Sequence, residues 1–286
     1  MATHKLQKSG RSFYVYVPTK WVNDNCLKKG NELNVAINSE GVLIKNIKNK
    51  KNIKKISLKI KTSNPKVISN AIMNLFVIGY DEFELILDKK IEKNDYKKLK
   101  EFIVLFGLNI VDLTDKIIKL YTNVEINDLK RYVKEYLYKS LNVSRMLLEN
   151  TSKELLEEQY SSFYYFRFLV QRTINRHNLG LINLDFNNFW AHYYENVALC
   201  LSKIINYMIQ IKDKKFIEKC KFLFEKLLIQ YSELNFEKIN DLFSFVEALS
   251  NNNVENYQDY YKRRIYKHFM LILKEFNKVS ILVRDN

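Results

Sequence analysis

The placement of proline and glycine is the feature of this chain that most constrains its fold. Both prolines, Pro18 and Pro65, lie before residue 66, and after residue 126 Gly180 is the only residue of either type. Proline and glycine are the residues that most often end or interrupt a helix. The long C-terminal part of the chain is therefore free to form long, uninterrupted helices.

That C-terminal part also has the apolar periodicity of packed helices. In its last segment Ile265, Phe269 and Ile272 follow one another at steps of three or four residues, which places them on one helical face. Similar stripes predict helices over residues 127–150, 152–177, 187–211, 214–234, 237–249 and 258–283. We therefore expect residues 126–286 to form an all-α helical bundle.

Residues 51–125 instead mix two periodicities. Apolar and polar residues alternate from Ile56 to Ile60, as in a strand, and Asn64 and Pro65 are suited to start the helix that follows. The segment predicts strands over 56–60, 83–87, 108–111 and 117–121, and helices over 65–77 and 94–106. We expect a small, compact α/β domain over residues 51–125.

The first 50 residues predict a third, smaller domain, made mostly of strands. Pro18 ends the first strand because it cannot donate to a ladder, and Gly30 suits the left-handed backbone that ends a helix. The pattern predicts a short helix over 19–26 and strands over 13–17, 32–37 and 42–44. A module of this size cannot bury a core alone, so we expect residues 1–50 to pair with a second copy.

The excess positive charge of the chain, formally +15, is concentrated at the N-terminal end. Residues 1–62 hold 14 Lys and Arg against three Asp and Glu, whereas the other 224 residues hold 33 against 29. An AT-rich coding sequence, which enriches lysine throughout a chain, would spread the excess positive charge more evenly. The uneven distribution favours a surface that binds a polyanion, and DNA is the first candidate.

The chain offers no recognisable catalytic centre. Its six glycines are too scattered for a phosphate-binding loop or a dinucleotide-binding motif. His192 and Glu195 could place two metal ligands one helical turn apart, but a polar face of a bundle helix explains them more simply. Cys200 lies in an apolar helical stripe and is expected to be a small core residue. We therefore expect that the protein is not an enzyme.

The aromatic run Phe163–Phe166 in the helical part allows two interpretations. Aromatic rings can stack on nucleobases. Phe163, Phe166 and Val170 lie on one helical face, however, so we favour packing in a core.

Other features indicate the compartment. Cys26, Cys200 and Cys220 are odd in number and widely spaced, which fits neither a disulfide framework nor a zinc site. No run approaches 18 uncharged apolar residues, and residues 1–8 lack the apolar core of a signal peptide. We expect a cytoplasmic protein with reduced thiols and no insertion into a membrane.

The N-terminal module resembles a known DNA-binding domain. Three segments follow each other in the order found in AbrB/MazE-type (SpoVT-AbrB) swapped-hairpin domains. They are residues 5–12, Val17-Pro18-Thr19-Lys20-Trp21-Val22 and Leu27-Lys28-Lys29-Gly30. The resemblance implies a homodimer whose intertwined hairpins present basic side chains to double-stranded DNA. At matching positions it implicates Lys5, Lys8, Arg11 and Lys20, with Lys28 and Lys29 as outer phosphate contacts.

The rest of the chain resembles the archaeal PhoU-like phosphate uptake regulators, which join such a domain to a PhoU-like helical bundle. The resemblance is carried by residues 78–81, 105–111 and 168–172, with weaker support from 195–198 and 281–283. PhoU helices in that family bind metal clusters through paired acidic residues. Here Tyr160 and Tyr164 stand where the first acidic pair should be, and Leu199 replaces the partner of Glu195. We therefore expect no metal centre and no cofactor.

These observations lead to one expected function and two alternatives. The first is a DNA-binding transcriptional regulator of phosphate uptake or a related process. The second is a PhoU-like signalling adaptor that binds phosphate transporter components and uses its hairpin for dimerisation only. The third, a metal-storing protein or metal-dependent enzyme, is disfavoured by the two tyrosines.

Overall fold

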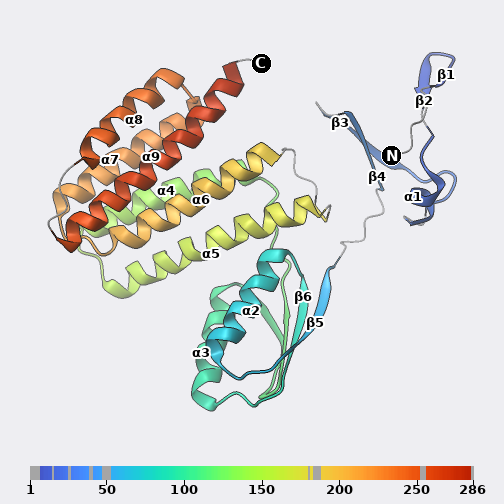
Figure 1. Cartoon of the computed structure of the whole chain (residues 1–286), viewed down its shortest axis with the longest axis horizontal. Coiled ribbons are helices and arrows are strands. Elements are labelled where there is room, and N and C mark those ends of the chain that lie inside the picture. Colours follow the sequence, from blue (N-terminus) through green and yellow to red (C-terminus); the bar gives the residue numbers. More distant parts are fainter. Residues whose placement is uncertain are drawn as a thin grey trace. The chain divides into compact units, whose positions relative to one another are not determined.

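The structure is a computed structural model of the 286-residue chain (Figure 1). It describes residues 7–14, 16–24, 27–38, 41–46, 53–179, 181–182, 188–251 and 256–284. The chain divides into two compact units, residues 1–52 and residues 53–286. The α/β segment and the helical segment belong to the same compact unit.

The N-terminal unit consists of two hairpins and a short helix. Strands β1 (Gln7–Ser9) and β2 (Ser12–Tyr14) pair antiparallel around Gly10, whose φ of 59° suits the tight turn. Helix α1 (Thr19–Asp24) follows, and strands β3 (Leu33–Asn38) and β4 (Gly41–Asn46) form the second antiparallel pair. The strand expected over 13–17 is shorter than predicted and has a partner strand directly before it. The helix is confirmed over residues 19–24, and residues 25–26 lie outside the described residues.

The second unit begins with a mixed four-stranded sheet. Its strands are β5 (Lys55–Ile60), β6 (Glu82–Leu87), β7 (Asn109–Leu113) and β8 (Ile117–Tyr121), in the order β5-β6-β8-β7. Strands β5 and β6 are parallel, and the other neighbours are antiparallel. Helix α2 (Pro65–Ile78) connects β5 to β6, and helix α3 (Lys93–Leu105) connects β6 to β7. All the elements expected over residues 56–121 are confirmed within a few residues.

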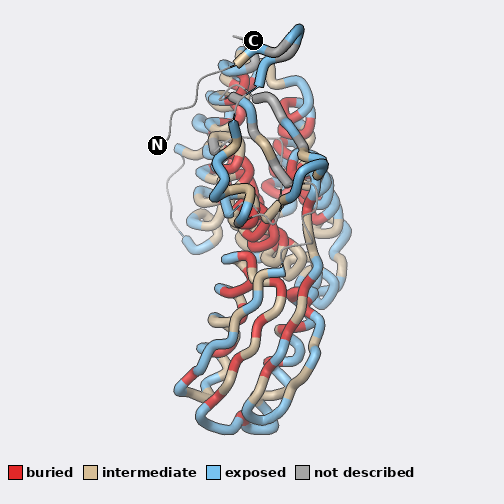
Figure 2. Tube along the Cα trace, turned by 90° about the vertical axis from the view of Figure 1, so that its right-hand side faces the viewer, coloured by how far each residue is buried: buried red, intermediate tan, exposed pale blue. Residues whose placement is uncertain are grey.

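Both helices cover the same face of this sheet (Figure 1). Phe83, Leu85 and Leu87 of β6 point to the helices and are buried, whereas Glu82 and Glu84 alternate with them on the other face. This alternation of burial along the strands is visible in Figure 2. The uncovered face carries surface ion pairs such as that between Glu84 and Lys119 (2.9 Å). The alternation is that of a sheet with one packed and one open face.

The remaining elements are the six helices expected from the apolar stripes. They are α4 (Leu129–Leu148), α5 (Lys153–Asn178), α6 (Asn188–Met208), α7 (Lys214–Glu233), α8 (Phe236–Ser250) and α9 (Tyr257–Arg284). Side-chain oxygens of Asp128, Ser152, Asp213 and Asn235 accept hydrogen bonds from backbone N–H groups in the first turns of α4, α5, α7 and α8, and so cap these helices. The principal helix pairs are α6 with α9, α8 with α9, α4 with α7 and α5 with α6.

Aromatic side chains fill the interior between these helices. Phe163 and Phe166 are fully buried, and the ring of Phe166 stacks on Tyr136 with 3.6 Å between centroids. This confirms that the aromatic run of α5 belongs to the core. Cys200 and Cys220 are also buried and free, as a core role for Cys200 requires.

The coarse fold class is thus confirmed as a small hairpin module, a mixed sheet unit and a mostly helical C-terminal region. Within the described residues, none of the helices has both the length and the apolar character needed to cross a membrane.

Candidate functional site

The cationic residues expected to bind DNA lie on the surface of the N-terminal unit. Lys8 is in β1, Arg11 is in the hairpin turn, Lys20 is in the first turn of α1, and Lys28 and Lys29 precede Gly30. All five side chains are exposed, and none of them forms an ion pair with a described residue. We call these five residues the basic surface. Lys5, the sixth expected contact, lies outside the described residues.

The same unit has no core of its own among the residues whose burial the structure describes. Between Gln7 and Ile44 none of these residues is buried. Four apolar or aromatic side chains are more than half exposed: Phe13 at 62%, Tyr16 at 58%, Val35 at 56% and Val42 at 64%. Exposed apolar groups of this size favour burial against another surface. The described part of the unit therefore leaves these apolar side chains uncovered.

The basic surface can supply charge-assisted hydrogen bonds to several phosphates at once. Phosphate contacts of this kind set affinity and register on a duplex, but they carry no base sequence information. The amino group of Lys8 lies 5.8 Å from the centroid of the Phe13 ring, so one cation of the surface adjoins an exposed aromatic side chain. The arrangement suits binding of a polyanion with little sequence selectivity from these residues alone.

A second polar cluster lies deep inside the other compact unit. Arg172 and Arg176 of α5 both donate to Oδ1 of Asp81, each at 2.6 Å, and Oδ2 of Asp81 accepts the N–H of Lys54 at 3.0 Å. Arg176 also donates to Oε1 of Glu125 at 3.0 Å. We call Asp81, Glu125, Arg172 and Arg176 the arginine cluster. It joins the start of β6 to the last turns of α5.

The arginine cluster also donates hydrogen bonds to backbone carbonyl groups at the C-terminal end of α2. Arg172 donates to the carbonyl oxygens of Phe76 (2.8 Å) and Tyr80 (2.7 Å), and Arg176 donates to that of Gly79 (3.0 Å). Asn175, between the two arginines, donates to the carbonyl of Val77 at 2.8 Å. Carbonyl groups at a helix end have no partner within the helix, and cations there interact favourably with the helix dipole. These contacts tie the sheet unit to the helices.

Burial and the neighbouring Arg176 lower the pKa of Arg172 to about 10, so its guanidinium still carries its charge at neutral pH. Arg172 is fully buried and Asp81 is 5% exposed. A buried charge is tolerated only when it is paired and hydrogen-bonded. Asp81 and the backbone carbonyls therefore hold both guanidinium groups in place, although the Nε atoms of Arg172 and Arg176 have no hydrogen-bond partner among the described residues.

The cluster was not expected from the sequence, although both of its segments had been noted. Residues 78–81 and 168–172 were singled out only for their resemblance to PhoU-like regulators, and the structure brings them into contact. The available signal was Arg172 and Arg176 at a spacing of four on the apolar face of a long helix. Two arginines on a buried face require acceptors from another element.

Two residues at positions that match the family's metal-binding motifs, the replacement Tyr164 and the retained Glu195, have other contacts. Tyr164 packs against Phe106 and Phe168, and Glu195 accepts a hydrogen bond from Gln171 at 2.8 Å. In the part of the chain that the structure describes, no group of three or more His, Cys, Asp or Glu residues lies close enough together to hold a metal ion.

Two histidines of the helical region have contrasting environments. His192 is exposed on α6. His268 stacks on Tyr207, with 6.0 Å between ring centroids, and neither of its ring nitrogens has a hydrogen-bond partner among the described residues. Burial, together with Arg264, Lys203 and Lys267, lowers the pKa of His268 to about 4. His268 is therefore neutral in the folded protein at neutral pH.

This lowered pKa predicts a loss of stability in mild acid. The unfolded chain binds a proton at His268 near pH 6.5, whereas the folded chain binds it only near pH 4, so stability falls as the pH drops between these values. We expect His268 to lower the free energy of unfolding by about 2 kcal/mol between pH 7.5 and pH 5. Urea denaturation at both pH values measures this change in the free energy of unfolding.

His268→Gln should remove this part of the pH dependence, because glutamine does not titrate. His192→Gln is the matched control and should leave it unchanged. Equal pH dependence in the wild type and in His268→Gln would contradict the prediction.

Comparison with known protein families, with curated proteins and with solved structures gives no match to this chain.

Proposed function

We propose that this protein is a DNA-binding transcriptional regulator that acts as a homodimer and controls phosphate uptake. The observation that carries the proposal is the N-terminal unit, which combines an exposed basic surface with exposed apolar side chains and no buried residue among those whose burial is described. Pairing with a second copy would bury the apolar side chains. It would also double the number of cations presented to a duplex.

The assignment to phosphate uptake rests on the resemblance to archaeal PhoU-like regulators. Two of the segments that carry this resemblance meet in the arginine cluster, through Asp81 and Arg172. This contact supports treating them as parts of one architecture. The DNA-binding part of the proposal is independent of the process regulated and can be tested alone.

Replacing two cations of the basic surface should weaken DNA binding and reduce its dependence on salt. We expect the full-length Lys8→Gln/Arg11→Gln variant to bind duplex DNA at least tenfold more weakly than the wild type. Two lost phosphate contacts per chain in a dimer should reduce the slope of log affinity against log salt by about 3 to 4. Gel-shift or anisotropy titrations at several salt concentrations measure both quantities.

The matched control is Lys97→Gln/Lys100→Gln, which removes the same charge from the exposed surface of α3. If the two double variants lose affinity equally, the basic surface is not the DNA contact. If the wild type binds no DNA but retains phosphate transporter components in a pull-down, the signalling adaptor replaces the regulator as the function.

A further inference from the structure

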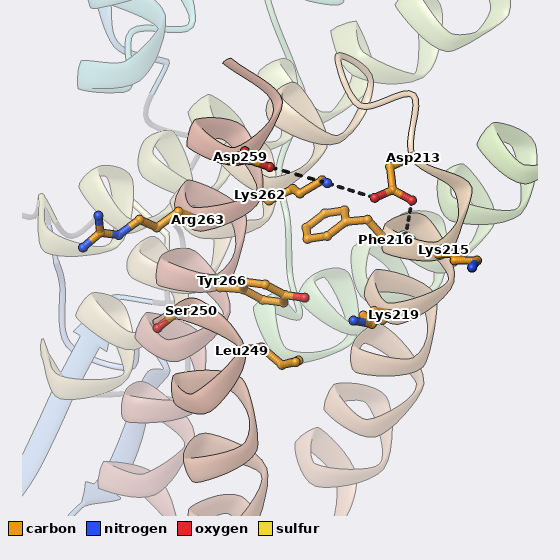
Figure 3. Close-up of a pocket in the computed structure, with 10 residues that line it drawn as sticks. All are labelled: Asp213, Lys215, Phe216, Lys219, Leu249, Ser250, Asp259, Lys262, Arg263 and Tyr266. Atoms are coloured by element: carbon orange, nitrogen blue, oxygen red, sulfur yellow. Dashed lines mark hydrogen bonds and ion pairs between the residues drawn. The ribbon is translucent and has the colours of Figure 1, made fainter. Parts of the chain in front are cut away.

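A cavity of about 270 Å³ lies where the start of α7, the end of α8 and the first half of α9 meet (Figure 3). Four of the residues that line it are cationic and two are acidic. The cations are Lys215, Lys219, Lys262 and Arg263, and the acids are Asp213 and Asp259. The cavity belongs to the helical region and shares no residue with the basic surface or the arginine cluster.

One of the four cations, Lys262, forms ion pairs with both acidic residues. The amino group of Lys262 lies 2.9 Å from a carboxylate oxygen of Asp213 and 3.7 Å from one of Asp259. Asp213 also accepts the N–H of Phe216 at 3.1 Å, and its hydrogen bond with Lys262 lowers its pKa. Lys215, Lys219 and Arg263 have no ion-pair partner among the described residues. The cavity therefore has an excess of positive charge that the described residues do not neutralise.

The hydroxyl group of a largely buried tyrosine also points into the cavity. Tyr266 is only 4% exposed, and in Figure 3 its hydroxyl is directed toward the side of the cavity where the amino group of Lys219 lies. This hydroxyl makes no hydrogen bond to a described residue. Burial raises the pKa of Tyr266, so the group is an O–H donor at neutral pH. An anion between Tyr266 and Lys219 would satisfy this donor.

A second hollow, of about 530 Å³, adjoins the first through Ser250 and Arg263, which line both. It adds Arg264 and Lys267, and none of the described residues that line it is acidic. Arg264 interacts with Tyr207 through a hydrogen bond, so its charge is not paired with a carboxylate there. Positive charge thus continues from one hollow into the next around α9.

We propose that this cavity binds a small phosphate-bearing anion, with Lys219 as a charged contact and the hydroxyl of Tyr266 as a further donor. Arg263, whose side chain points away from Lys219 in Figure 3, would contact the anion at the border with the second hollow. A phosphate group offers several acceptors and up to two charges, which matches several donors better than a single carboxylate does. The volume is at the lower end of ligand pockets, so the ligand is small. Phe216 and Leu249 supply apolar surface for an organic part. The site does not depend on the DNA-binding proposal.

The test is calorimetric titration of the full chain at constant ionic strength with inorganic phosphate, pyrophosphate and ADP. We expect at least one of the three to bind, and Lys219→Gln/Arg263→Gln to weaken its affinity at least tenfold. Tyr266→Phe should weaken it several-fold while preserving the buried ring. Tighter binding of ADP than of pyrophosphate would identify an organic phosphate as the ligand, and the reverse would identify an inorganic one.

The matched control is Lys226→Gln/Lys274→Gln, which removes the same charge from exposed positions on the same two helices. It should leave binding unchanged. Absence of binding by all three ligands at millimolar concentration, or equal losses in the two double variants, would overturn the proposal. So would a Lys219→Gln/Arg263→Gln variant that loses duplex DNA binding but binds all three ligands as the wild type does, because these two cations would then contact nucleic acid and not a small anion.

Discussion

Replacing Asp81 with asparagine is expected to lower the free energy of unfolding by about 3–5 kcal/mol. The carboxylate of Asp81 is the shared acceptor for Arg172 and Arg176, and both guanidinium groups are almost completely buried. Asparagine keeps the shape of the side chain but removes the negative charge. Two neighbouring buried cations would then have only Glu125, which is partly exposed, as a counter-charge. Urea denaturation followed by circular dichroism measures the loss.

Asp115→Asn is the control for this experiment. Asp115 forms an equally direct ion pair with Lys90 at 2.8 Å, but both side chains are largely exposed. Solvent screens such a pair, so its removal should cost far less than that of Asp81. A loss for Asp81→Asn no larger than that of the control would contradict the role assigned to the arginine cluster.

The shared carboxylate also predicts non-additive effects. Arg172→Met should be strongly destabilising in the wild type, because Phe76, Tyr80 and Asp81 lose a donor. In the Asp81→Asn background Arg172→Met removes a charge that has lost its counter-charge. It should therefore lower the free energy of unfolding by less than it does in the wild type. A double-mutant cycle measures this coupling.

The second large effect is expected from replacing Gly79 with alanine, which should lower the free energy of unfolding by about 2–4 kcal/mol. Gly79 ends α2 with a φ of 103°, a conformation that disfavours any side chain. A Cβ atom there would lie 2.8 Å from Cγ of Arg176. Arg176 cannot move aside freely, because Asp81 and Glu125 hold its guanidinium. The substitution therefore strains the backbone and disturbs the arginine cluster together.

Gly107→Ala separates these two causes. Gly107 also has a positive φ, 60°, but a Cβ atom there would meet only the terminal hydroxyl of Tyr165, at 3.3 Å. We expect a cost of about 1–2 kcal/mol, from the backbone conformation alone. If Gly79→Ala and Gly107→Ala have equal effects in urea denaturation, the contact with Arg176 is unimportant.

The helices and the sheet strands were largely predictable because their signals are local. The spacing of Ile265, Phe269 and Ile272 defines a helical face without reference to any other part of the chain. Asn64 caps α2 as expected, accepting the N–H of Lys66 at 2.9 Å. The first hairpin was less accurately predicted, since β1 consists of polar residues and its pairing with β2 depends on the turn at Gly10.

The sequence by itself determined the helical and sheet segments and the concentration of charge at the N-terminal end. These follow from periodicity, caps and composition, which are properties of neighbouring residues. Only the tertiary structure decided that Asp81 lies against Arg172 and Arg176, 91 and 95 positions away, and that Lys219 and Tyr266 line one cavity. Contacts at such separations depend on how whole elements pack, and no local pattern specifies that packing.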